Sequence, residues 1–123
     1  MKESEILKTV KQMLQTRKTL GEILWWRRLQ TGLFYTRSGT PVNIGGKSSL
    51  EDGKDLDLIA IISRPDGGYS ILFIDTKASG KNGFSYEQQV FVDSMKRKPR
   101  VLCATLNDPE MLPKLIEQAK NLP

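Results

Sequence analysis

The stretch DLDLIAIISRPDGGYSILFIDTK, residues 55–77, decides the fold. Two apolar runs flank the turn RPDGG, and both are rich in the residue types that favour strands. We therefore predict a β-hairpin with strands at 56–63 and 69–76. Charged side chains stand at the outer ends of these strands, where a sheet usually buries apolar residues: Asp57, Asp75 and Lys77.

The turn also predicts which residues of the two strands face each other. Asp57 and Asp75 are equally far from Asp66 in the middle of the turn, so a symmetric hairpin opposes them with Cβ atoms about 4.5–5.5 Å apart. Lys77 points to the same face as Asp75, because side chains alternate along a strand. Directly opposed like charges destabilise a sheet, and a bound divalent cation reverses that effect. The alternative is that these are merely solvated strand ends.

Composition narrows the functional classes. The chain has 123 residues, which suits a single domain, 1–123, and its net charge of +5 favours an anionic partner, nucleic acid before a membrane surface. No apolar run approaches the length of about 18 residues that a membrane span needs. Histidine is absent and there is one cysteine, which excludes a Ser-His-Asp triad, ordinary zinc sites and an internal disulfide. Catalysis would rest on carboxylates, lysine and a hard metal ion such as Mg²⁺ or Mn²⁺.

The remaining chain predicts an α/β fold with a small mixed sheet flanked by helices. Apolar residues at helical spacing indicate a helix at 3–16, and a glycine-rich stretch indicates a long loop at 37–54. The other expected elements are strands at 23–29, 33–36 and 101–105, a turn-rich segment at 78–83, a helix at 85–97 and a helical tail from Asp108.

Three segments in order resemble the VRR-Nuc branch of the PD-(D/E)xK nucleases: GKDLDLIAI (53–61), FIDTK (73–77) and SYEQQVF (85–91). In that branch a glycine precedes an Asp-Leu strand, the next strand carries Asp/Glu-x-Lys, and a helix opens with Ser-x-x-Gln. The resemblance covers residues 3–106. It implies a restriction-endonuclease-like core and an endonuclease that hydrolyses phosphodiester bonds of DNA with Mg²⁺ or Mn²⁺.

The resemblance also implies roles for individual residues. Asp57 and Asp75 would bind the metal together with the Thr76 carbonyl, and Lys77 would position or activate the attacking water. The second acid is more often glutamate in this branch, so Asp75 leaves the metal geometry open. Gln88 matches the family glutamine, although Ser85-x-x-Gln88 is also a capping box that would open the second helix.

The family uses a further acid on its first helix, and this chain offers two. Glu3 lies in helical phase with the apolar stripe that includes Ile6 and Val10, whereas Glu5 falls toward the polar side. We therefore choose Glu3 as a catalytic and metal-binding residue. The alternative is that an acid in a first helical turn is simply favoured by the helix dipole.

Partners follow from the same resemblance. Phage members of the family suggest a homodimer that acts on branched DNA such as Holliday junctions, and a cytoplasmic location, in the host cell if the protein is phage-encoded. The residues expected to contact DNA are Arg28, Lys47, Lys54 and Lys81. Of the adjacent Trp25 and Trp26, one is expected in the core and the other at a dimer contact. Two alternatives stay open: a non-catalytic nucleic-acid-binding module on the same fold, or a nuclease for plain duplex, flap or single-stranded DNA.

Overall fold

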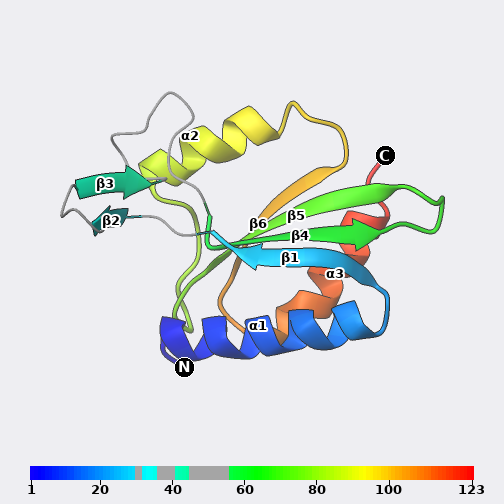
Figure 1. The fold of residues 1–123 in the computed structure, drawn as a ribbon, viewed down its shortest axis with the longest axis horizontal. Helices are drawn as coiled ribbons and strands as arrows, with labels where there is room; N and C mark the ends of the chain where they lie inside the picture. The colour runs from blue at the N-terminus through cyan, green and yellow to red at the C-terminus, as the bar shows by residue number, and fades with distance from the viewer. Residues whose placement is uncertain (30–31, 36–40, 45–55) are drawn as a thin grey trace.

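A four-stranded mixed sheet forms the centre of the molecule in the computed structural model, which describes residues 1–29, 32–35, 41–44 and 56–123 (Figure 1). Its strand order is β1-β4-β5-β6, antiparallel between β1 and β4 and between β4 and β5, and parallel between β5 and β6. The strands are β1 (Ile23–Arg28), β4 (Leu58–Ser63), β5 (Tyr69–Thr76) and β6 (Val101–Leu106). The predicted small mixed sheet is therefore confirmed.

Helices cover both faces of this sheet, as expected. α1 (Glu3–Thr19) and α3 (Leu112–Lys120) lie on one face, and α2 (Tyr86–Met95) lies on the other (Figure 1). A short 3₁₀ turn, η2 (Pro109–Met111), leads into α3. Pro113 stands in the first turn of α3, where a missing backbone N–H leaves no helical hydrogen bond unmade. In the described ranges no helix combines the length and the apolar character that a membrane span needs.

The hydrophobic core has two parts, one on each side of the sheet. The larger part joins α1 and α3 to the sheet, and α1 contributes the fully buried Ile6, Val10 and Leu14 at intervals of one helical turn. The smaller part lies under α2, where Phe73 of β5 meets Phe91 edge-on with ring centroids 5.1 Å apart. Truncating one such buried side chain typically costs about 2–5 kcal/mol, so these contacts contribute strongly to holding α1 and α2 against the sheet.

The predicted hairpin is present with the predicted register. Leu58 lies opposite Ile74 and Ser63 opposite Tyr69, as a turn centred on Asp66 requires. Within the turn, Gly67 adopts a φ of 86°, a conformation that glycine tolerates without steric cost. The paired ladder ends at Leu58 and Ile74, one pair short of Asp57 and Asp75.

The sequence-based prediction for residues 37–54 is wrong. The stretch 37–54 was expected to be a single loop, but Pro41–Ile44 forms a strand, β3, that pairs antiparallel with β2 (Gly32–Tyr35) in a separate two-stranded sheet. The sequence PVNI is short and begins with a proline, so it carries no strand signal of its own. Its extended form comes from pairing with β2, with Pro41 at the first position, where the missing N–H is tolerated.

Candidate active site

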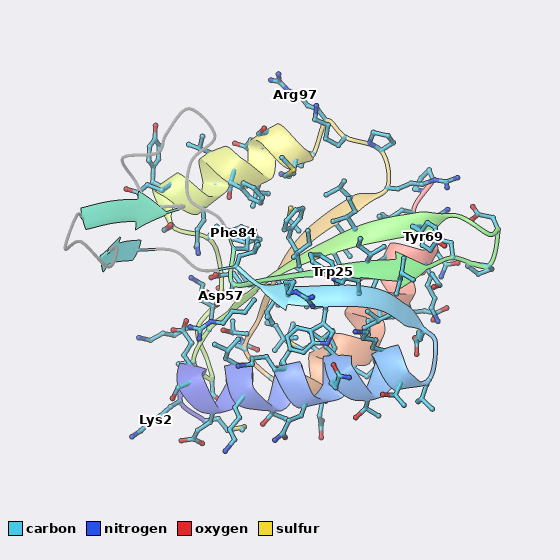
Figure 2. The ribbon with its side chains drawn as sticks, viewed as in Figure 1. Lys2, Trp25, Asp57, Tyr69, Phe84 and Arg97 are labelled. Atoms are coloured by element: carbon cyan, nitrogen blue, oxygen red, sulfur yellow. The ribbon has the colours of Figure 1, made fainter. Side chains whose placement is uncertain are left out.

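Asp57 lies at the end of the sheet opposite the β4–β5 turn, just before β4 begins (Figure 2). Its backbone oxygen accepts a hydrogen bond from Leu29 N at 2.7 Å, which ties it to the end of β1. Its carboxylate Oδ2 accepts two hydrogen bonds from Thr76, from the backbone N at 2.9 Å and from Oγ1 at 2.8 Å. The half-buried Asp57 is therefore bonded to β5 through Thr76. The sequence predicted Asp57 and Asp75 as a directly opposed pair of the two strands, and this is corrected, because the paired ladder ends at Leu58 and Ile74.

Asp75 is the buried acid of the site, only 2% exposed near the end of β5. Its Oδ2 lies 2.8 Å from Lys77 Nζ. Burial raises the pKa of Asp75, hydrogen bonds with Lys77 and Gln88 oppose that rise, and the negative charge of Asp57 adds to it. The unfavourable interaction between the two carboxylates, which the sequence predicted, thus acts on Asp75.

Gln88 links the helix α2 to the acid and the lysine. Its side-chain Oε1 accepts hydrogen bonds from Lys77 Nζ at 3.3 Å and from the backbone N of Ser85 at 3.0 Å. The backbone N of Gln88 donates to Ser85 Oγ at 3.2 Å. The predicted capping box is therefore present. The side chain is buried and contacts Lys77, the partner of Asp75, so Gln88 serves the helix cap and the acid–lysine pair at the same time.

Packing of α2 on the sheet explains why Gln88 lies beside Lys77. Phe73, Asp75 and Lys77 alternate onto the face of the sheet that α2 covers. Phe73 packs against Phe91, and Gln88 lies about one helical turn before Phe91. The aromatic contact therefore fixes the N-terminal end of α2 over the end of β5.

Comparison of the chain with models of protein families, with curated proteins and with solved structures found no match.

The donor set of the site fits a hard divalent cation. Carboxylate oxygens are the ligands that Mg²⁺ and Mn²⁺ prefer, and Mg²⁺ is commonly held by only one or two protein carboxylates, with water and phosphate completing its shell. Asp57 and Asp75 supply two such groups. In the part of the chain that the structure describes, no group of three or more His, Cys, Asp or Glu side chains is arranged to hold a metal. Asp57 and Asp75 are the candidate ligands, and their role in metal binding stays a prediction.

Glu3 lies outside this cluster. It is exposed in the first turn of α1, on the same side of the helix as the buried Ile6 and Val10. Ser79 N donates to Met1 O at 3.1 Å, so the start of α1 lies against the segment that follows Lys77. This contact keeps Glu3 near that end of the sheet, and its role in metal binding stays a prediction.

The expected DNA-contacting residues are only partly described. Arg28 is exposed at the end of β1, opposite Leu58 and hence next to the strand position of Asp57. Lys81 is exposed in the segment after Lys77, and Asn107 Nδ2 donates to its carbonyl at 2.7 Å. Lys47 and Lys54 lie outside the described residues.

The two tryptophans differ in their packing. Trp26 packs against the core on the α1 side, and its Nε1 donates to Gln15 Oε1 at 3.0 Å. Trp25 is half-buried, with the guanidinium of Arg27 4.9 Å from the centre of its ring. Trp26 is thus the tryptophan that packs against the core, and the dimer contact expected of the other stays a prediction.

Sequence reasoning missed the hydroxyl of Thr76. Only its carbonyl was considered, as a metal ligand, yet the side chain is fully buried and bonded to Asp57. The available signal was a polar residue between Asp75 and Lys77, at the end of a strand whose central positions 71–74 are apolar.

Proposed function

We propose that this protein is a metal-dependent DNA endonuclease of the VRR-Nuc type, with a restriction-endonuclease-like core. One observation carries the proposal. Lys77 Nζ lies within hydrogen-bonding distance of both Asp75 Oδ2 and Gln88 Oε1. At the same end of the sheet, Asp57 is hydrogen-bonded to Thr76. The three sequence segments that resemble the family therefore meet at one point, although the segment 78–84 separates the third from the second.

A purely structural role explains this cluster less well. A buried carboxylate beside a second carboxylate costs stability, and one lysine offsets only part of that cost. Titratable groups perturbed by burial and by a neighbouring like charge are typical of functional sites. A divalent cation between Asp57 and Asp75 would remove the repulsion, which favours a metal site.

Individual residues of the chain would then have separate roles in phosphodiester hydrolysis. When bound, the metal would polarise the scissile phosphate and lower the pKa of a coordinated water. Lys77 would stabilise the negative charge that develops on the phosphate, since its ammonium group already lies beside the metal-binding carboxylate. Gln88 would hold the ammonium group of Lys77 in place through Oε1.

DNA is the proposed substrate because the net charge of +5 favours a polyanion and because the resembling family acts on DNA. Arg28 and Lys81 are exposed on segments that flank the site, where phosphates could be bound. By the same resemblance we propose a homodimer that cuts branched DNA such as Holliday junctions. A two-fold dimer would present two sites to two symmetric strands.

The proposal is tested with labelled four-way junction, flap, linear duplex and single-stranded DNA, each incubated with Mg²⁺, Mn²⁺ or excess chelator. Lys77→Met, which keeps most of the side-chain length and removes the charge, is purified in parallel as the control for contaminating nuclease. Metal-dependent cutting by the wild type alone is the expected result. Undiminished cutting in chelator would contradict it, and binding without cutting in any metal would favour the non-catalytic nucleic-acid-binding module.

A further inference from the structure

The hydroxyl of Thr76 has a specific partner at the candidate site. Thr76 is fully buried, and both its backbone N–H and its hydroxyl donate to the same oxygen, Asp57 Oδ2, at 2.9 and 2.8 Å. Hydrogen bonds to an ionised carboxylate are stronger than those between neutral groups. Two donors on one oxygen fix the rotation of the Asp57 carboxylate and leave the lone pairs of Oδ1 to other partners.

The end of the ladder explains why Thr76 meets a side chain. Ile71 and Lys77 donate their backbone N–H groups toward the β6 side, to Arg100 O and Leu106 O. Backbone N–H groups point alternately to the two neighbouring strands, and Thr76 lies an odd number of residues from both Ile71 and Lys77, so its N–H points toward β4. The β4–β5 ladder stops at Leu58 and Ile74, and the carboxylate of Asp57 takes the place of a strand carbonyl.

We propose that Thr76 is a positioning residue, whose hydroxyl orients the Asp57 carboxylate for a divalent cation. The inference deepens the proposed function and rests on its metal-binding part. It concerns the side chain, whereas the resemblance to the family implies a role only for the Thr76 carbonyl. Side-chain substitutions leave that carbonyl in place, so the two roles can be separated.

Ser70 offers a matched comparison on the same strand. It is also fully buried, and its hydroxyl donates to Ala119 O at 2.6 Å, at the end of β5 far from Asp57. That hydrogen bond ties β5 to α3 and touches no carboxylate of the site. The Ser70 hydroxyl also accepts from Arg64 NH1 at 2.8 Å, so its removal deletes two hydrogen bonds of a buried side chain and is at least as disruptive as removal of the Thr76 hydroxyl. Only the Thr76 hydroxyl contacts a candidate metal ligand.

The test is calorimetric titration of Mn²⁺ into the full chain without DNA, together with thermal unfolding in chelator. Removing a group that orients a metal ligand typically weakens metal binding about 10–100-fold, and we expect Thr76→Val to fall in that range. Thr76→Ser, which retains the hydroxyl, should bind Mn²⁺ like the wild type. Ser70→Ala should lower the unfolding temperature and leave Mn²⁺ affinity unchanged. If Thr76→Val does not fold, Thr76→Ser and Thr76→Ala are compared instead, since these two differ by the hydroxyl alone.

The outcomes separate the two proposals. Mn²⁺ binding that Thr76→Val or Thr76→Ala leaves at wild-type affinity, while Asp57→Ala abolishes it, would overturn the positioning role and leave the nuclease proposal intact. A wild-type protein that binds no Mn²⁺ would overturn both. Weaker binding in Thr76→Val with recovery in Thr76→Ser would support the positioning role, because a purely structural hydrogen bond would change stability without changing affinity.

Discussion

The ammonium nitrogen of Lys77 lies 2.8 Å from Asp75 Oδ2, two residues away on the same face of the extended chain. Asp75 is almost fully buried, whereas the side chain of Lys77 is 23% exposed. The lysine therefore contacts a buried carboxylate and is also partly exposed to solvent, from which a phosphate would approach. This geometry suits a group that stabilises charge on a substrate better than one that only neutralises a buried acid.

Alanine substitution should separate cutting from binding. Removing the Lys77 ammonium is expected to lower the cleavage rate about 10²–10³-fold, the typical loss when one charge-stabilising donor is deleted. Asp57→Ala and Asp75→Ala should abolish cutting, because each would remove a proposed metal ligand. DNA affinity, measured by fluorescence anisotropy, should change little in all three. A wild-type cleavage rate in any of them would refute the role assigned to that residue.

The two acids of the first helical turn should differ in effect. Glu3 shares the side of α1 that carries Ile6 and Val10, and the start of this helix is tied to Ser79 close to Lys77. Glu3→Gln should therefore reduce cleavage far more than Glu5→Gln, measured as single-turnover rates at saturating Mg²⁺. The reverse ranking would mean that the wrong acid was chosen.

The dual role of Gln88 can be dissected with its capping partner. Ser85→Ala removes the hydroxyl that accepts from Gln88 N, which should cost about 1 kcal/mol of stability, but it keeps the contact between Gln88 and Lys77. Gln88→Ala removes both. Cleavage should thus fall strongly in Gln88→Ala and little in Ser85→Ala, when both are assayed well below their unfolding temperatures. Equal losses would assign Gln88 to the helix cap alone.

A cluster away from the site should govern the acid stability of the fold. Glu22 Oε2 lies 2.7 Å from Arg17 NH1, and its Oε1 lies 2.9 Å from Lys120 Nζ, so it joins the end of α1 to α3. Burial raises the pKa of Glu22, but hydrogen bonds and charge interactions with Lys120 and Arg17 outweigh burial, and the net shift is downward. A carboxyl group with a lowered pKa stabilises the fold above its ordinary pKa, and that stability is lost as the pH falls through the lowered value.

Glu22→Gln should therefore lower the free energy of unfolding at pH 7 by about 1 kcal/mol, the upper range for partly exposed ion pairs. The difference from wild type should vanish in acid, once Glu22 is protonated in both the folded and the unfolded state. Urea unfolding across the pH range checks this, with Glu110→Gln as a control for the loss of one exposed charge. A difference that persists unchanged in acid would show that packing, and not charge, is responsible.

The oligomeric state and the DNA preference can be measured together. Light scattering should give the mass of a dimer, and a four-way junction should be cut faster than linear duplex at matched salt. DNA binding should weaken steeply as salt rises, because phosphate contacts by Lys and Arg release counterions. A monomer that cuts both substrates equally well would leave the nuclease proposal standing and remove the junction preference.

Local sequence determined the hairpin and the helix start. The glycines of RPDGG and the apolar runs on either side were enough to predict the register of β4 and β5, because turn geometry sets the pairing of the strands it joins. Ser85 and Gln88 predicted the cap of α2 in the same way, since a capping box needs only residues three positions apart. Asp75 and Lys77 share a face because side chains alternate along a strand, which any extended chain would ensure.

Tertiary structure decided the rest of the candidate site. Gln88 reaches Lys77 because the contact of Phe73 with Phe91 fixes α2 over β5, and Asp57 binds Thr76 because the ladder ends one pair early. β3 likewise exists only through its pairing with β2. These features depend on contacts between segments far apart in the chain, whose energy comes from packing and strand pairing, and periodicity within one segment carries no information about them.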